Sequence, residues 1–209
     1  MPAVQNHAMN TSNSIDFFDR QFRQQVENQD FQLNPFERAA LPHLHGRVLD
    51  FGCGLGNLAM AAAAQGCSVV ALDASPSAIA ALRLRAQAAA LPVEAVEADL
   101  RGYALNDDFD CVVAIGLLMF FDCTTARRVL TMLQDRVRPG GIAVINVLIE
   151  GTTWLDMFGT ENCCLFARSE LAGRFAGWDI LHSEFSDFDA PGQTIKSFVT
   201  LIARKPAPP

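Results

Sequence analysis

The stretch VLDFGCGLGNLAMAAAAQG, residues 48–66, decides the fold of this chain. An apolar run with the length of a buried strand passes directly into Gly52, Gly54 and Gly56, and an alanine-rich run typical of a helix follows. Because glycine has no Cβ atom, such a turn lets a ligand approach the backbone, and the first N–H groups of the helix point toward it. The stretch therefore predicts a ligand-binding turn between a strand and a helix.

Apolar runs of strand length alternate with helix-like runs along the chain, which predicts βαβ units and a parallel sheet covered on both faces. Two later runs, WDILHSEFSDF and TIKSFVTLIARK, have no crossover helix between them, so we expect an antiparallel hairpin at the sheet edge. The expected strands before this hairpin are residues 47–52, 68–73, 93–99, 109–115 and 141–149. The expected helices are residues 57–66, 75–90, 123–141 (ended by Pro139 and two glycines) and 168–177.

The length of 209 residues is typical of one domain with a modest addition. We expect residues 1–13 to be a disordered N-terminus and residues 14–45 to form a helical cover over the active site. Residues 46–205 are expected to be the main domain, with an irregular insert at residues 150–168.

Composition narrows the class of protein. Half of the residues are hydrophobic and the net charge is −7, which argues against general nucleic-acid binding and favours a small-molecule substrate. No apolar run reaches the ~18 residues of a membrane span, and no secretory segment is recognisable, so we expect a cytoplasmic protein, monomeric or homodimeric. The six cysteines lack CxxC spacing and are expected to be reduced, with no metal site.

Two acids define the ligand that the glycine turn would bind. Asp73 ends the second strand about 20 residues after the glycines, where a carboxylate reaches the two hydroxyls of a ribose. Asp50 precedes the glycines, where it would repel a phosphate and attract an ammonium group. The Gly-x-Gly-x-Gly spacing also differs from the Gly-x-Gly-x-x-Gly of dinucleotide-binding turns. Together these features predict a cationic ligand that contains adenosine.

Four segments in this order resemble the class I S-adenosylmethionine-dependent methyltransferases: VLDFGCGLG, VVALDAS, VEADL and RPGGIAVI. The resemblance covers residues 40–205. It implies a Rossmann-like α/β fold with a seven-stranded, mostly parallel sheet, an antiparallel C-terminal hairpin and helices on both faces. It also implies S-adenosyl-L-methionine as cofactor and S-adenosyl-L-homocysteine as product.

The resemblance assigns roles to individual residues. The glycine turn would lie under the methionine part of the cofactor, Asp73 would accept from ribose, and Asp99 with Leu100 would meet adenine. Ile115 and Gly116 would face the sulfonium. The implied cofactor-binding residues are Asp50, Gly52, Gly54, Gly56, Asp73, Ala74, Asp99, Leu100, Ile115 and Gly116.

The second half of the chain is similar to the tellurite-resistance (TehB-like) methyltransferases, which methylate oxyanions and related species of soft elements. The similarity lies in LLMFFDCTTARRVLTMLQDRVRPGG, LFARSELAGRFAGWDIL and IKSFVTLIARK. Members proposed to act on tellurite carry basic residues around the last hairpin turn, whereas this chain has Ser186, Asp187 and Thr194 there. This departure makes a thiol, a neutral metalloid hydroxide or a small organic acceptor at least as good a candidate as an oxyanion.

Candidate substrate-pocket residues come from the cover, from the segment after the fourth strand and from the insert. They are Phe17, Phe18, Phe36, Met119, Phe120, Trp154, Phe158 and Phe166. We expect Phe17 and Phe18 to close over the cofactor. The adjacent thiols of Cys163 and Cys164 are candidate soft ligands or exchange partners for a substrate thiol, with simple packing as the alternative. His182 is a candidate base, with a structural role as the alternative.

Three functions are compatible with the sequence. The first is methyl transfer from S-adenosylmethionine to a small molecule, including soft-element species of tellurium, selenium, arsenic or thiol sulfur. The second is a protein that binds S-adenosylmethionine or S-adenosylhomocysteine without turnover. The third is an NAD-dependent enzyme, which the glycine spacing, Asp50 and the terminal hairpin disfavour.

Overall fold

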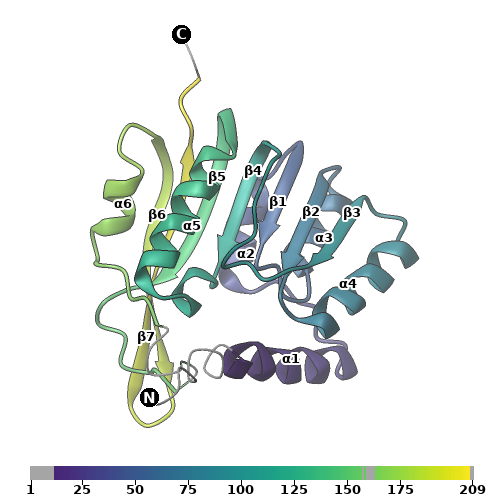
Figure 1. The fold of residues 1–209 in the computed structure, drawn as a ribbon, viewed down its shortest axis with the longest axis horizontal. Helices are drawn as coiled ribbons and strands as arrows, with labels where there is room; N and C mark the ends of the chain where they lie inside the picture. Colours follow the sequence, from purple (N-terminus) through teal and green to yellow (C-terminus); the bar gives the residue numbers. More distant parts are fainter. Residues whose placement is uncertain (1–11, 157, 159–162, 208–209) are drawn as a thin grey trace, which may run out of the picture.

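A seven-stranded sheet forms the centre of the molecule (Figure 1). The structure, a computed structural model, describes residues 12–156, 158 and 163–207. The strand order is β3-β2-β1-β4-β5-β7-β6, and only the pairs β5–β7 and β7–β6 are antiparallel. The predicted mostly parallel sheet with a C-terminal hairpin is therefore confirmed. The strands are β1 (Arg47–Phe51), β2 (Ser68–Asp73), β3 (Val93–Glu97), β4 (Phe109–Ile115), β5 (Val137–Leu148), β6 (Asp179–Ala190) and β7 (Thr194–Arg204).

Helices cover both faces of the sheet, and each face has its own apolar core. Val48 of β1 packs with α3 and α4, whereas the next residue, Leu49, packs with α5 and α6 on the opposite face. Because successive strand residues point to opposite faces, burial on both sides explains the unbroken apolar run in β1. The helices are α1 (Ser12–Glu27), α2 (Pro35–Ala40), α3 (Asn57–Ala64), α4 (Pro76–Ala88), α5 (Cys123–Asp135) and α6 (Glu170–Arg174), with short 3₁₀ turns η1 (Leu41–His43) and η2 (Leu118–Phe120).

Helix α1 lies across the carboxyl ends of the parallel strands, at the bottom of Figure 1. It begins at Ser12, inside the segment that we expected to be disordered, while residues 1–11 lie outside the described residues. Helix α2 follows, and it starts at a capping box in which Asn34 and Glu37 bond reciprocally to each other's backbone N–H.

The predicted helix over residues 123–141 is corrected by the structure. Helix α5 ends at Asp135, and Pro139 lies inside β5 rather than at a helix end. Between Phe109 and Cys111 of β4, the pairing partner on β5 moves from Val137 to Ile142, so the Pro-Gly-Gly segment forms an irregularity in the strand. Proline is tolerated at such an irregularity because no ladder hydrogen bond is required there.

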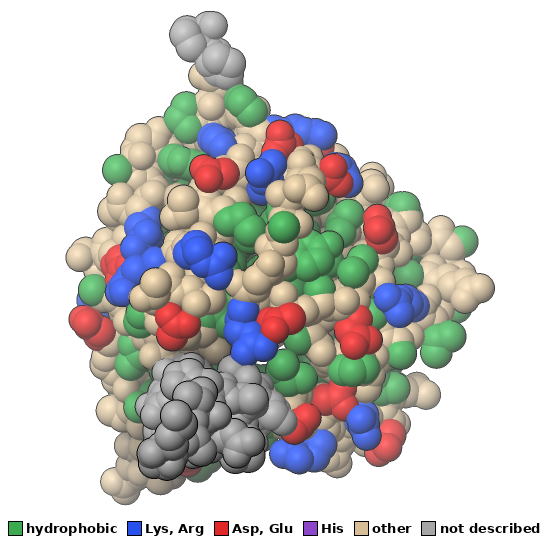
Figure 2. All heavy atoms as spheres, in the orientation of Figure 1, with side chains coloured by type: hydrophobic (Ala, Val, Ile, Leu, Met, Phe, Trp, Pro, Cys, Tyr) green, Lys and Arg blue, Asp and Glu red, His purple; other side chains and the backbone are tan. Residues whose placement is uncertain are grey.

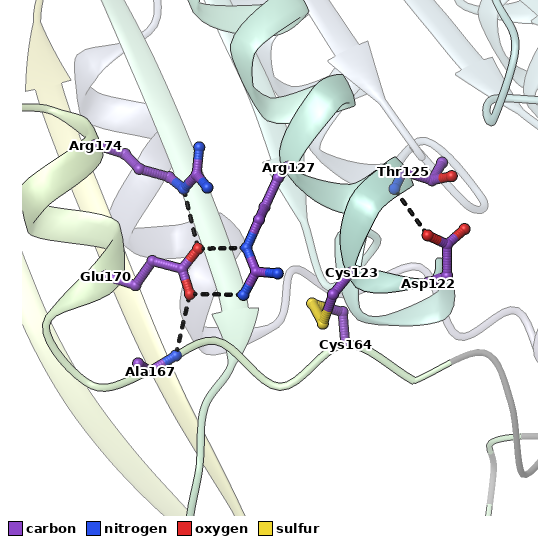
Figure 3. Close-up of a disulfide and its surroundings, with 8 residues drawn as sticks. All are labelled: Asp122, Cys123, Thr125, Arg127, Cys164, Ala167, Glu170 and Arg174. Carbon is purple, nitrogen blue, oxygen red and sulfur yellow. Dashed lines mark hydrogen bonds and ion pairs between the residues drawn. A yellow bond between two sulfur atoms is a disulfide. The ribbon is translucent and has the colours of Figure 1, made fainter.

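The expectation that all six cysteines are reduced is wrong. Cys123, the first residue of α5, forms a disulfide with Cys164 of the insert, and Figure 3 shows both beside an ion-pair network. In that network Glu170 of α6 accepts from Arg127 of α5 at 2.7 Å and from Arg174 at 3.0 Å. Because these cysteines are 41 residues apart, their spacing gave no sign that the fold would bring them together.

Loss of this disulfide is expected to lower the free energy of unfolding by about 2–4 kcal/mol, because it closes a long loop in the unfolded chain. Urea unfolding with and without a reductant measures the effect. The Cys123→Ser/Cys164→Ser variant should no longer respond to reductant, whereas Cys163→Ser, which removes a free thiol, should respond like the wild type. Equal wild-type stability in both conditions would contradict the prediction.

The surface carries charges of both signs. In the view of Figure 2, acidic and basic side chains are interspersed rather than gathered into one basic patch. No helix in the described part of the chain combines the length and hydropathy that a bilayer span requires.

Candidate functional site

A cavity of about 360 Å³ lies at the carboxyl ends of the parallel strands, between the sheet and α1. This is the edge where ligands bind in open α/β sheets, and the volume falls in the range of small-molecule sites. All predicted cofactor-binding residues except Gly56 line it, namely Asp50, Gly52, Gly54, Asp73, Ala74, Asp99, Leu100, Ile115 and Gly116.

The glycine turn leaves β1 with left-handed backbone at each glycine, with φ of +87° at Gly52, +51° at Gly54 and +68° at Gly56. Gly54 is where the turn meets the cover, because a Cβ atom there would lie 3.0 Å from the ring of Phe22. Gly56 instead faces α4, where a Cβ atom would lie 2.5 Å from Leu82. The turn therefore uses Gly54 at the cavity and Gly56 for close helix packing.

Replacing Gly56 with Ala is expected to lower the free energy of unfolding by about 2–4 kcal/mol, from backbone strain at positive φ plus overpacking against Leu82. Gly66→Ala is the matched control, since Gly66 also has positive φ but nothing lies within 4 Å of its Cβ position. Thermal unfolding of both variants makes the comparison. A Gly56→Ala variant no less stable than Gly66→Ala would refute the packing role.

Asp73 is held rigidly at the end of β2. Its Oδ2 accepts from the N–H of Gly54 at 2.8 Å, and its Oδ1 accepts from the N–H of Ser75 at 2.9 Å. Burial raises the pKa of Asp73, while these N–H groups oppose that rise. Each carboxylate oxygen accepts more than one hydrogen bond, so both can still accept from ligand hydroxyls.

Asp50 is a buried carboxylate whose Oδ2 has no hydrogen-bond partner among the described residues. Asp50 is only 5% exposed. Burial is the main cause that raises its pKa to about 8, and repulsion from Glu37 and Asp73 adds to this rise. Glu37 reaches the same cavity from α2, and burial raises its pKa as well. This concentration of acids in the cavity lining favours a cationic ligand.

Asp99 and Arg101 form the rim of the cavity next to Leu100. Arg101 donates to both carboxylate oxygens of Asp99, at 2.8 and 2.5 Å, and this pairing lowers the pKa of Asp99. Of the described residues that line the cavity, Arg101 is the only Arg or Lys. The cavity therefore has a negative balance of charge.

Aromatic side chains from α1 and from the segment after β4 form a wall of the cavity. Phe18 of α1 packs edge-on against Phe120 with ring centroids 4.9 Å apart, and Phe22 and Phe121 also line the cavity. Phe158 lies behind this wall, with its ring centroid 4.9 Å from that of Phe120. Of the predicted pocket residues, Phe18 and Phe120 are in the wall.

The other predicted pocket residues do not line the cavity. Phe17 points outward and is 41% exposed, Met119 and Phe166 are buried in the core, and Trp154 packs against Lys196. Phe36 forms an aromatic cluster with Phe188 and Phe198 of the hairpin, and so joins α2 to the sheet edge. These side chains pack the protein rather than shape the pocket.

The predicted catalytic candidates are also placed elsewhere. Cys164 is in the disulfide, so no adjacent pair of free thiols exists, and the free thiol of Cys163 does not line the cavity. His182 lies in β6, with its Nε2 3.4 Å from Glu184, away from the cavity lining. Asp187 of the hairpin, expected near the acceptor, is likewise not part of the lining.

Several cavity residues were not predicted from the sequence. Ile15, Phe22 and Gln25 share a helical spacing along α1 with the predicted Phe18 and all line the cavity, and that period was the available signal. Glu37 could have been found from the Asn34-x-x-Glu37 capping box, which fixes where α2 starts.

Comparison with known proteins agrees with this geometry. Residues 48–141, from β1 into β5, match the family model described as a methyltransferase domain. Residues 48–141 therefore carry a methyltransferase domain. This methyltransferase domain is similar in structure to TehB from Haemophilus influenzae, with a TM-score of 0.73 and 20% identity over 92% of this chain and 67% of that chain.

Two further proteins are similar to this chain. The 1,6-didemethyltoxoflavin-N1-methyltransferase of Burkholderia thailandensis, solved with S-adenosylhomocysteine, has a TM-score of 0.65 and 20% identity over 98% of this chain and 94% of that chain. Hemagglutinin 1 of Eikenella corrodens is 30% identical over 167 residues, which is 77% of this chain. The chain spans only 55% of that relative's length.

Proposed function

We propose that this chain transfers the methyl group of S-adenosylmethionine to a small molecule and releases S-adenosylhomocysteine. The observation that carries the proposal is the unpartnered, buried Oδ2 of Asp50 at the glycine turn. An ammonium group, which the methionine part of the cofactor carries, complements this oxygen. A dinucleotide phosphate offers no cation to this oxygen and would bring negative charge into a cavity lined by acids, which argues against an NAD-dependent enzyme.

Other residues at the same edge of the sheet would make the remaining contacts with the cofactor. Asp73 has acceptor capacity for the ribose hydroxyls, and Leu100 offers an apolar surface for adenine. When bound, the cofactor supplies a methyl group on a positively charged sulfur that is already activated for transfer. The task of the protein is then to exclude water and to hold the acceptor atom ~3 Å from that methyl. Phe18 and Phe120 serve the first task, and their rings also favour a nearby cation.

The negative balance of charge in the cavity determines which class of methyl acceptor fits it. Glu37, Asp50, Asp73 and Asp99 line it, whereas the single described cation, Arg101, is held by Asp99. We infer an uncharged acceptor with a soft nucleophilic atom, such as thiol sulfur or a neutral selenium, tellurium or arsenic species. Oxyanions such as tellurite and selenite would meet these acids with no unengaged cation in the described lining, and are disfavoured.

We also propose the kind of partner and the cellular location of the protein. The interspersed surface charges of Figure 2 support a small-molecule substrate over nucleic acid. A cytoplasmic location and a monomeric or homodimeric state are retained as proposals. Thiol alkylation in intact cells tests the location, because the Cys123–Cys164 disulfide is more typical of an oxidising compartment.

An acceptor screen tests the proposed reaction. Purified protein with methyl-labelled S-adenosylmethionine is offered small thiols, arsenite, small phenols, tellurite and selenite. We expect label in an uncharged acceptor, with thiols or arsenite, which is uncharged at neutral pH, ahead of tellurite and selenite. Binding of the cofactor with no transfer to any acceptor would support the sensor alternative instead, and faster transfer to tellurite than to thiols would refute the charge argument.

A further inference from the structure

The cover helix α1 is attached to the rest of the protein by a buried carboxylate. Asp19 is 8% exposed, and its Oδ1 accepts from the Oγ of Ser75 at 2.6 Å and from the Oγ of Ser77 at 2.5 Å. The backbone N–H of Ser77 donates to the same oxygen at 3.1 Å, and Arg23 donates to Oδ2 at 2.6 Å.

The amino end of α4 is suited to receive this carboxylate. Pro76 has no N–H, and the N–H of Ala78 is already bonded to the Ser75 side chain, so the N–H of Ser77 is the one that Asp19 takes. A negative charge is also favoured at the positive end of a helix dipole. Burial alone would raise the pKa of Asp19, but the bonds from Ser75, Ser77 and Arg23 outweigh it and lower the pKa to about 2. Asp19 is therefore ionised at neutral pH.

The bonds of Asp19 fix the helix at the place where it covers the cavity. Phe18, its neighbour, is in the aromatic wall, and Phe22, one turn later, packs over the space that Gly54 leaves open. Ser75 connects α1 to the end of β2, because its Oγ donates to Asp19 while its N–H donates to Asp73. One residue thus bonds both to the acid that holds the cover and to the proposed ribose-binding acid.

We propose that Asp19 is a positioning residue that latches α1 over the cofactor cavity through Ser75 and Ser77, and so controls how fast the cofactor leaves. The identity of the cofactor rests on the proposed function. The latch itself rests on the contacts of Asp19 alone, so the two are tested separately.

Hydrogen exchange tests the latch without any ligand. In Asp19→Asn we expect the amides of residues 12–27 to exchange at least about tenfold faster than in the wild type, since charge-assisted bonds are lost, while β1 and β4 keep their protection. Ser77→Ala is a milder variant that keeps the Ser75 helix cap, and it should shift the same amides in the same direction. Glu27→Gln, an exposed acid on the same helix, is the control for charge and should change nothing.

Stopped-flow dissociation of S-adenosylhomocysteine tests the consequence. We expect the dissociation rate to rise about tenfold in Asp19→Asn and less in Ser77→Ala, with a smaller change in the association rate. Unchanged α1 exchange in Asp19→Asn would overturn the latch, and faster exchange with an unchanged dissociation rate would overturn its control of release. A wild-type protein that binds no S-adenosylhomocysteine would overturn the proposed function, while the exchange result would still decide the latch.

Discussion

Asp73→Ala is expected to weaken the binding of S-adenosylhomocysteine about 100-fold. The change removes two acceptor oxygens for the ribose hydroxyls and also frees the N–H groups of Gly54 and Ser75, which shape the turn and the start of α4. Charge-assisted hydrogen bonds contribute about 1.5–3 kcal/mol each, so two of them account for an effect of this size. Isothermal titration calorimetry measures the dissociation constant.

Glu97→Ala is the matched control for Asp73→Ala. Glu97 is the acid paired with Asp73 in register at the end of the neighbouring strand β3, but it is exposed and does not line the cavity. We expect it to bind S-adenosylhomocysteine like the wild type. Equal dissociation constants for Asp73→Ala and Glu97→Ala would remove Asp73 from the binding site.

Asp50→Asn is expected to weaken cofactor binding about 10- to 100-fold and at the same time to stabilise the ligand-free protein above neutral pH. The affinity falls because the ammonium group loses its charged partner. The stability rises because the folded-state pKa of Asp50, about 8, lies above the unfolded value near 4. Between these values the folded state holds the extra proton, so wild-type stability falls as pH rises from about 4 to about 8, and an Asn side chain lacks this loss.

Two measurements check the prediction for Asp50. Urea unfolding at pH 6 and pH 8 should show less pH dependence in Asp50→Asn than in the wild type. Calorimetry at pH 6.5 in buffers of different ionisation enthalpy should show proton release on binding to the wild type, since an ammonium partner favours ionised Asp50. Proton release that persists in Asp50→Asn would assign the proton to another group, and unchanged affinity would exclude Asp50 from the cofactor contacts.

The fold, and most of the residues that line the cavity as the proposed cofactor-binding residues, could be predicted from the sequence because they are local features. Most of the predicted strands are largely apolar, and Asp50, Asp73, Asp99 and Gly116 each lie near the carboxyl end of a predicted strand. Parallel strands end at one edge of the sheet, so residues identified separately come together there. The sequence also predicted an acid at the glycine turn, because Asp50 lies two residues before Gly52.

Other features depend on packing between distant segments, which no local pattern records. Glu37 becomes a cavity residue only when α2 docks on the sheet, and Asp19 bonds to Ser75 and Ser77 only when α1 docks there. The docking of α2 also brings Phe36 against Phe198. The disulfide between Cys123 and Cys164 likewise requires the fold of the insert. After these corrections, the proposed methyl transfer depends on the charge and shape of the cavity and not on the cysteines.

Calorimetric titration of the wild-type protein with S-adenosylhomocysteine and with NADH tests the central claim, that the glycine turn and Asp50 bind a cationic methyl-donor cofactor. The account predicts one-to-one binding of S-adenosylhomocysteine with proton release at pH 6.5, and no measurable binding of NADH. Tight binding of NADH without binding of S-adenosylhomocysteine would contradict it.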